Sequence, residues 1–103
     1  MERLCFFIEL VPGTEEEYER RHRELWPEMH DALVEAGYTN YSLFRRGSTV
    51  VGYAECVPDV AAVLARMAAS EVTPRWNASF AGIIDKITDE NGSLVVAAEL
   101  WHL

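Results

Sequence analysis

The chain has 103 residues, with 9 Lys or Arg against 17 Asp or Glu, so its formal net charge is −8. Half of the residues are hydrophobic, which is too many for a disordered chain, and the length suits one domain spanning residues 1–103. An acidic chain lacks the cationic surface that nucleic acid and anionic membranes attract, so neither is an expected partner.

The longest apolar runs, residues 4–8 and 94–98, are far shorter than the roughly 18–20 residues that span a bilayer. The sequence enters a strand-like run near residue 1 without the pattern of a secretory signal, so we expect a cytoplasmic protein. Cys5 and Cys56 lie in separate strand-like runs, and we interpret them as reduced core residues.

The first half of the chain predicts a strand and a long helix. Residues 3–11 are strand-like, and Pro12-Gly13 ends them. Thr14 and Glu17 have the spacing of a capping box, and apolar residues then recur at helical spacing up to a stop at Gly37. Because proline has no backbone N–H, we expect a kink or break at Trp26-Pro27.

The second half predicts a hairpin, two helices and a last strand. The hairpin strands are residues 38–46 and 49–56, joined at Gly47-Ser48. One helix runs from Pro58-Asp59 to about Ala69, and a shorter one starts at Thr73-Pro74 and ends by Gly82. A turn at residues 89–93 leads into a last strand over residues 94–103.

The order β-α-β-β-α-β predicts an α+β, ferredoxin-like fold with an antiparallel sheet and both helices on one face. Both faces of the first strand are apolar, with Leu4 and Phe6 on one side and Cys5 and Phe7 on the other. Two helices cover one face only, so we expect a second copy to pack on the other face in a twofold dimer.

A candidate site starts in the first helix, where Tyr18, His22 and Trp26 are spaced by four and share one row of the helix surface. Histidine is the side chain best suited to exchange protons near neutral pH, and a break at Pro27 opens space beside it. No set of three or four ligands has metal-binding spacing, so no metal is expected.

Other aromatic and polar residues fall outside the hydrophobic periodicity. Tyr41 lies on the second strand, and Trp76 and Asn77 lie on the short helix. Rings beside hydroxyl and amide groups suit a sugar, whose C–H faces stack on rings while its hydroxyls form hydrogen bonds. Trp101 and His102, near the C-terminal end, are further candidates for the site or for an interface.

Four parts of the sequence carry a family resemblance: the segment from Glu17 to Glu28, the pairs Asn40-Tyr41 and Arg75-Trp76, and the segment 99–103. They resemble the L-rhamnose mutarotase family, and the resemblance spans essentially the whole chain. The resemblance implies a dimeric ferredoxin-like α/β barrel that uses no cofactor and interconverts the α and β anomers of L-rhamnose. It also implies that His22 is the proton donor and that Tyr18, Tyr41 and Trp76 contact the monosaccharide.

One position departs from the family pattern. The family usually has a second Trp directly after the first, where this chain has Asn77. Loss of that ring leaves open whether the sugar is L-rhamnose or a related 6-deoxy hexose.

The residues suit this reaction, because ring opening requires the ring oxygen to gain a proton as the anomeric hydroxyl loses one. Our hypothesis is that His22 donates to the ring oxygen while Tyr18 or Tyr41 fixes the sugar and helps the hydroxyl proton leave. Two alternatives stay open: a cofactor-using or haem-handling protein on the same dimeric barrel, by fold analogy, and a non-catalytic sugar-binding module.

Overall fold

The computed structural model describes all residues from 1 to 103. In chain order its elements are β1 (Glu2–Leu10), α1 (Glu15–Arg23), α2 (Pro27–Ala36), β2 (Tyr38–Arg46), β3 (Thr49–Cys56), α3 (Val60–Ala69), α4 (Val72–Ala78), β4 (Ile84–Lys86) and β5 (Val96–Ala97). The sheet is antiparallel in the order β2-β3-β1-β4, and β5 also pairs with β1. The α+β, ferredoxin-like prediction is confirmed.

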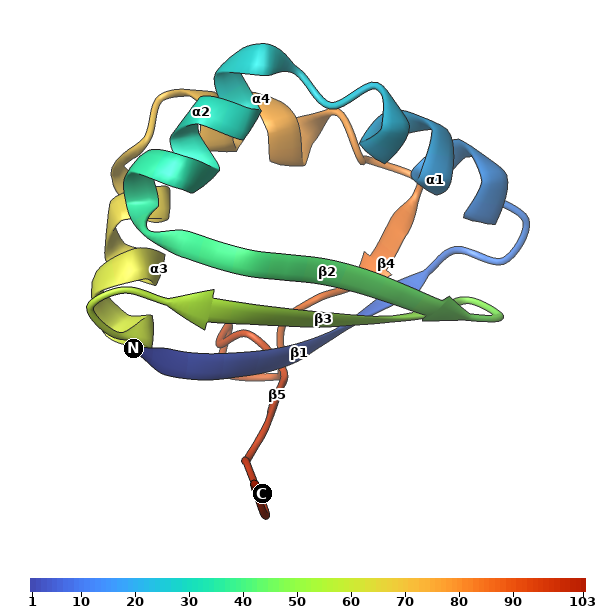
Figure 1. Ribbon diagram of the computed structural model, residues 1–103. Helices are drawn as coiled ribbons and strands as arrows, with labels where there is room; N and C mark the ends of the chain where they lie inside the picture. The colour runs from blue at the N-terminus through green and yellow to red at the C-terminus, as the bar shows by residue number, and fades with distance from the viewer.

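The helices gather on one side of this sheet. Figure 1 shows α1, α2 and α4 over one face and α3 at one end, while the C-terminal end leaves on the opposite side. None of the helices has the length and apolar character needed to cross a membrane.

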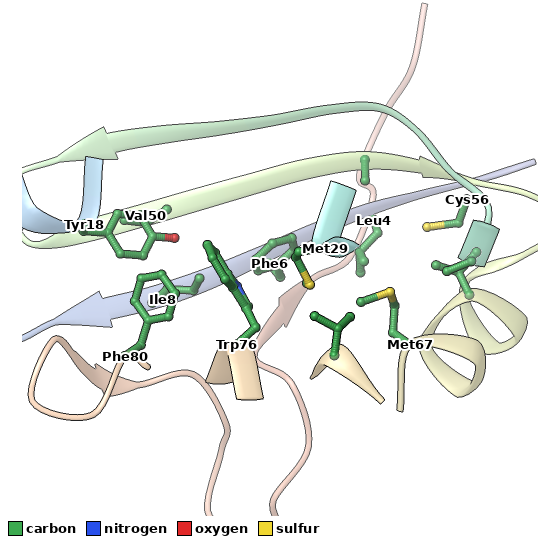
Figure 2. Close-up of a cluster of buried hydrophobic side chains, with 14 of the residues drawn as sticks. Leu4, Phe6, Ile8, Tyr18, Met29, Val50, Cys56, Met67, Trp76 and Phe80 are labelled. Carbon is green, nitrogen blue, oxygen red and sulfur yellow. The ribbon is translucent and has the colours of Figure 1, made fainter. Parts of the chain in front are cut away.

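The core lies between the sheet and the helices. Alternate residues of β1 are buried there, starting at Leu4 and ending at Leu10, as the sequence predicts (Figure 2). Phe6 lies opposite Gly52 on β3, and a Cβ at Gly52 would come within 2.2 Å of the Phe6 ring. Glycine is therefore required at this position, because the Phe6 ring occupies the space that a side chain would take.

The expected long helix is broken completely at Trp26-Pro27. The helix α1 ends at Arg23 and α2 begins at Pro27, with Trp26 extended at φ −59° and ψ 134°. Steric conflict with proline disfavours helical backbone in the preceding residue, and proline itself fits the first position of a helix. Gly37 ends α2 with φ +107°, so the predicted stop is confirmed.

The capping box predicted at Thr14 is wrong, because the Thr14 side chain makes no capping hydrogen bond. Instead of capping the helix, its hydroxyl donates to the backbone carbonyl oxygens of Val11, over 2.7 Å, and Ile83, over 3.2 Å. These bonds tie the start of α1 to the sheet edge. Asp59 does cap α3, accepting from the N–H of Ala62 over 2.8 Å.

The predicted start of the second short helix is also shifted. The helix α4 begins at Val72, one residue before Thr73, and the Thr73 hydroxyl is buried without a hydrogen-bond partner. Thr73 therefore lies inside the helix rather than before it, so it does not act as a cap.

The continuous last strand predicted over residues 94–103 is wrong. The edge of β1 is closed by two short segments, β4 opposite Glu9 and Leu10 and β5 opposite Cys5 and Phe6. Residues 87–95 leave the edge between them as a hairpin closed by the Thr88–Leu94 bridge. Residues 98–103 form no strand and are exposed.

Candidate active site

A cavity of about 490 Å³ lies between the helices and β2, a volume in the range of small-molecule sites. It is lined by residues of α1, α2, β2 and α4 and of the segment between α1 and α2, eight of its twelve lining residues being hydrophobic. The lining residues are His22, Leu25, Met29, His30, Leu33, Val34, Tyr38, Thr39, Asn40, Tyr41, Leu43 and Trp76. The structure therefore brings together His22, Tyr41 and Trp76, three residues singled out from the sequence. Tyr18, which is also predicted to contact the sugar, is buried beside His22 and does not line this cavity.

His22 is held by the backbone of its own helix. Its Nδ1 atom lies 2.9 Å from the carbonyl oxygen of Tyr18. A carbonyl oxygen can only accept, so Nδ1 carries the proton and the neutral ring has its lone pair on Nε2. Burial lowers the pKa of His22 from its ordinary value of 6.5, which keeps the ring neutral at pH 7. His22 thus offers a free basic nitrogen.

Three aromatic side chains surround the imidazole. The Tyr18 ring centroid lies 4.4 Å from that of His22, and Trp76 meets His22 edge-on at 5.6 Å. Phe80 packs against Tyr18, His22 and Trp76, at centroid distances of 4.8 to 5.7 Å. Figure 2 shows Tyr18, Phe80 and Trp76 gathered in one part of the core. Sequence reasoning missed Phe80 as a support, because its spacing looks like ordinary helix packing.

The row predicted through Tyr18, His22 and Trp26 stops after His22, because α1 ends at Arg23. Trp26 does not line the cavity; its ring instead packs edge-on against Trp76 with centroids 5.0 Å apart. Trp26 therefore packs against Trp76 without lining the cavity.

Tyr38 and Tyr41 form the wall on β2, with ring centroids 4.9 Å apart. Burial raises the pKa of Tyr18 and Tyr38 to about 12, and burial together with the neighbouring phenols of Tyr38 and Tyr18 raises the pKa of Tyr41 further. All three phenols keep their protons at neutral pH and can donate hydrogen bonds. Tyr38 was missed from the sequence, where its spacing of three from Tyr41 places the two on opposite faces of a regular strand.

The other candidates lie away from the cavity. Asn77, next to Trp76 on α4, is exposed and does not line it. Trp101 is 75% exposed. It belongs to the C-terminal segment, whose end lies on the side of the sheet away from α1, α2 and α4 (Figure 1). His102 Nε2 lies 2.9 Å from Nη2 of Arg3. Within one chain, neither Trp101 nor His102 reaches the cavity.

No three His, Cys, Asp or Glu side chains come together in an arrangement that would hold a metal ion. The only ionisable side chains that line the cavity, other than the two phenols, are His22 and the exposed His30. The chemistry within reach is therefore proton transfer and hydrogen bonding beside apolar walls.

Comparisons with known proteins agree on one family. The family model described as L-rhamnose mutarotase matches residues 3–103. L-rhamnose mutarotases of Listeria monocytogenes serovar 1/2a and Lachnoclostridium phytofermentans are 34% and 33% identical, each over 103 residues that cover 100% of this chain and 99% of the relative.

Solved structures agree as well. The crystal structure of an L-rhamnose mutarotase from Formosa agariphila has a TM-score of 0.81 at 25% identity, covering 100% of this chain and 99% of that one. Tetracenomycin F2 cyclase from Streptomyces glaucescens, at 16% identity and a TM-score of 0.62, shares the fold alone. The family match and the curated relatives together place this chain in the L-rhamnose mutarotase family.

Proposed function

We propose that this chain is an isomerase that interconverts the α and β anomers of L-rhamnose, or of a related 6-deoxy hexose, in the cavity between the helices and β2. One observation carries the proposal: a neutral imidazole with a free Nε2 lies beside an aromatic wall and protonated phenols in a cavity of about 490 Å³. The family match supports the same activity.

His22 is the proton-transfer residue of this proposal. Its Nε2 accepts the proton of the anomeric hydroxyl, the C1–O5 bond breaks, and the resulting imidazolium donates that proton to the ring oxygen. Both oxygens are bonded to C1 in the closed sugar, so one nitrogen serves both. Rotation about C1–C2 and the reverse steps give the other anomer, with no net gain or loss of atoms or electrons.

The phenols act as hydrogen-bond donors in this scheme. Their raised pKa values make Tyr18 and Tyr41 weak candidates for the base. We therefore assign Tyr41, which lines the cavity, to hold a sugar hydroxyl, and Tyr18, which is buried beside His22, to donate a hydrogen bond at the His22 end. Trp76 supplies an aromatic surface for the C–H groups of the sugar.

The apolar side of the cavity suits a deoxy sugar. Leu25, Met29 and Leu33 line the same cavity as His22 and Tyr41. We place the 6-methyl group against these apolar residues, where a 6-hydroxyl would lose its hydrogen bonds to water. The exposed Asn77 makes no direct sugar contact in this arrangement.

We also propose a homodimer in the cytoplasm. Phe7, Val51 and Phe44 are register partners across β1, β3 and β2, and they form an apolar row on the face away from the helices, where Phe44 is 63% exposed. Leu100 and Leu103 are more than 95% exposed. A second copy would bury these groups. Both cysteines are free, which suits a reducing compartment.

Saturation-transfer NMR tests the reaction, because it measures anomer exchange at equilibrium. The wild-type protein should accelerate exchange of L-rhamnose, and His22→Ala should lower the rate by about 10²–10⁴-fold. A folded His22→Ala variant with full activity would rule out the role of His22. A panel of 6-deoxy and parent hexoses then identifies the sugar, and binding without exchange would favour a non-catalytic module.

A further inference from the structure

We propose that Asn40, clamped by Glu55, is a positioning residue that turns Tyr41 into the cavity by holding a bulge in β2. This inference rests on the proposed function, since it assigns a role to residues around the same site. Asn40 borders the cavity and Glu55 does not, and in this proposal both act through Tyr41 rather than by contact with the sugar.

The spacing of the two β2 tyrosines requires such a bulge. In a regular strand, residues three apart point to opposite faces, yet Tyr38 and Tyr41 lie side by side with ring centroids 4.9 Å apart. The register explains this, because Thr39 pairs with Glu55 and Ser42 with Tyr53. Two residues of β2 therefore lie opposite one residue of β3, which is the pattern of a β-bulge.

The backbone of Asn40 makes the bulge. Asn40 has φ +46° and is the only residue other than glycine with a positive φ. Asparagine adopts this left-handed region more readily than most residues, glycine adopts it freely, and β-branched residues strongly avoid it. The residue type thus matches the backbone that the bulge needs.

The side chain of Asn40 locks this conformation from the outer face of the sheet. Its Nδ2 donates to Oε2 of Glu55 over 3.1 Å, and the hydroxyl of Tyr53 donates to the same oxygen over 2.7 Å. The Thr39 hydroxyl donates to the backbone carbonyl of Glu55 over 3.0 Å. Four residues on two strands therefore fix the bulge.

The bulge decides where the Tyr41 ring lies. The ring meets Phe6 edge-on at 6.1 Å, on the side of the sheet that carries the core and the cavity. With regular alternation from Thr39 onward, Tyr41 would instead share the outer face with Thr39. An altered bulge would therefore withdraw the Tyr41 hydroxyl from the sugar without changing Tyr41 itself.

A kinetic double-mutant cycle tests the inference. We expect Asn40→Val to lower kcat/KM for anomer exchange by about 10- to 100-fold, because a misplaced binding group is costly. Asn40→Gly keeps the left-handed backbone but loses the bond to Glu55, so its kcat/KM should fall between those of wild type and Asn40→Val. In a Tyr41→Ala background, Asn40→Val should cost almost nothing more, since the group it misplaces is already absent.

Two further variants test the clamp and separate positioning from general stability. Glu55→Gln keeps an oxygen that can accept from Asn40 and should restore most of the activity that Glu55→Ala loses. Asp59→Ala removes the cap of α3 far from the cavity and should lower stability with kcat/KM unchanged. Asn40→Ala, with a smaller backbone penalty, replaces Asn40→Val if the latter does not fold.

A readout independent of activity distinguishes this inference from the proposed function. Nuclear Overhauser contacts between the Tyr41 and Phe6 rings should be present in wild type and Asn40→Gly and lost in Asn40→Val. Unchanged ring contacts in Asn40→Val, or full additivity with Tyr41→Ala, would overturn the positioning role. A wild-type protein that shows these contacts but does not accelerate exchange would overturn the proposed function instead.

Discussion

The imidazole of His22 donates from Nδ1 to the carbonyl oxygen of Tyr18, one turn earlier in α1, over 2.9 Å. The acceptor is a backbone atom, so the tautomer of His22 does not depend on which side chain occupies position 18. The Tyr18 hydroxyl is a separate group, and Tyr18 lines a smaller pocket that shares His22 with the cavity. The two roles of Tyr18 can therefore be separated by substitution.

We expect Tyr18→Phe to preserve the His22 tautomer and to lower kcat/KM for anomer exchange by about 10-fold, the cost of one neutral hydrogen bond. His22→Ala should lose far more, because it removes the proton-transfer group. The ¹⁵N chemical shifts of the His22 ring in Tyr18→Phe check the tautomer. A change of tautomer would contradict the backbone assignment.

The pH dependence should follow from His22. Burial lowers its pKa below 6.5, so the rate should be level near pH 7 and fall in acid as Nε2 is protonated and can no longer accept a proton. The pKa of about 12 for Tyr18 and Tyr38 predicts no loss of their protons up to about pH 10. Exchange rates measured between pH 5 and 10 test both the fall in acid and the level rate up to pH 10. A fall in rate centred above pH 6.5 would contradict the assignment of His22 as the proton acceptor.

Stability should respond to the same group. The folded state disfavours protonated His22, so the unfolded chain binds more protons as the pH falls below 6.5. The contribution of His22 is therefore fully present above pH 6.5 and is lost as the pH falls through the lower, folded-state pKa. Thermal unfolding of wild type and His22→Gln across pH 5 to 8 should show a smaller pH dependence in the variant.

Gly52→Ala should damage the site indirectly. The added Cβ would lie 2.2 Å from the Phe6 ring, and Phe6 is the edge-on neighbour of Tyr41. Overpacking of this kind costs about 1–3 kcal/mol of stability, and displacement of Phe6 should also raise KM. Urea unfolding and exchange kinetics on one sample measure both effects. Gly47→Ala is a control for backbone strain alone. Gly47 lies in an exposed loop with φ +59°, and its added Cβ would contact nothing.

The proposed dimer predicts a change in mass. Phe44→Asp, which places a charge in the apolar row of the outer sheet face, should convert a species of twice the chain mass to a monomer. Ala61→Asp adds the same charge at an exposed position of α3 and should leave the mass unchanged. Light scattering after size-exclusion chromatography measures both, and a monomeric wild type would refute the dimer.

Local patterns predicted most of the fold. The hairpin strands β2 and β3 match their predicted ranges because each has turn residues at its ends, and the break at Pro27 follows from a missing N–H. The split edge of β1 could not be predicted, because three residues in β4 and two in β5 carry no periodic signal. Thr14 was misassigned because its hydroxyl bonds to Ile83, far away in sequence.

The site was only partly predictable for the same reason. His22, Tyr41 and Trp76 stand out by residue type, and the cavity joins them. Tyr38 was missed because the rule of alternation fails at a bulge, and a bulge depends on pairing with another strand. Asn77 is predicted because its amide follows the Trp76 ring in sequence, where the family usually has a second Trp, but adjacent helical residues point in different directions.

The bulge in β2 has a second consequence, because β2 is one of the two edges of the sheet. An unpaired edge strand exposes backbone N–H and C=O groups that can pair with a strand of another molecule, which is a route to aggregation. A bulge breaks the regular spacing of those groups, and Arg45 and Arg46 add charge at the end of the same strand. Asn40, which positions Tyr41 in our proposal, therefore also protects this edge against unwanted strand addition.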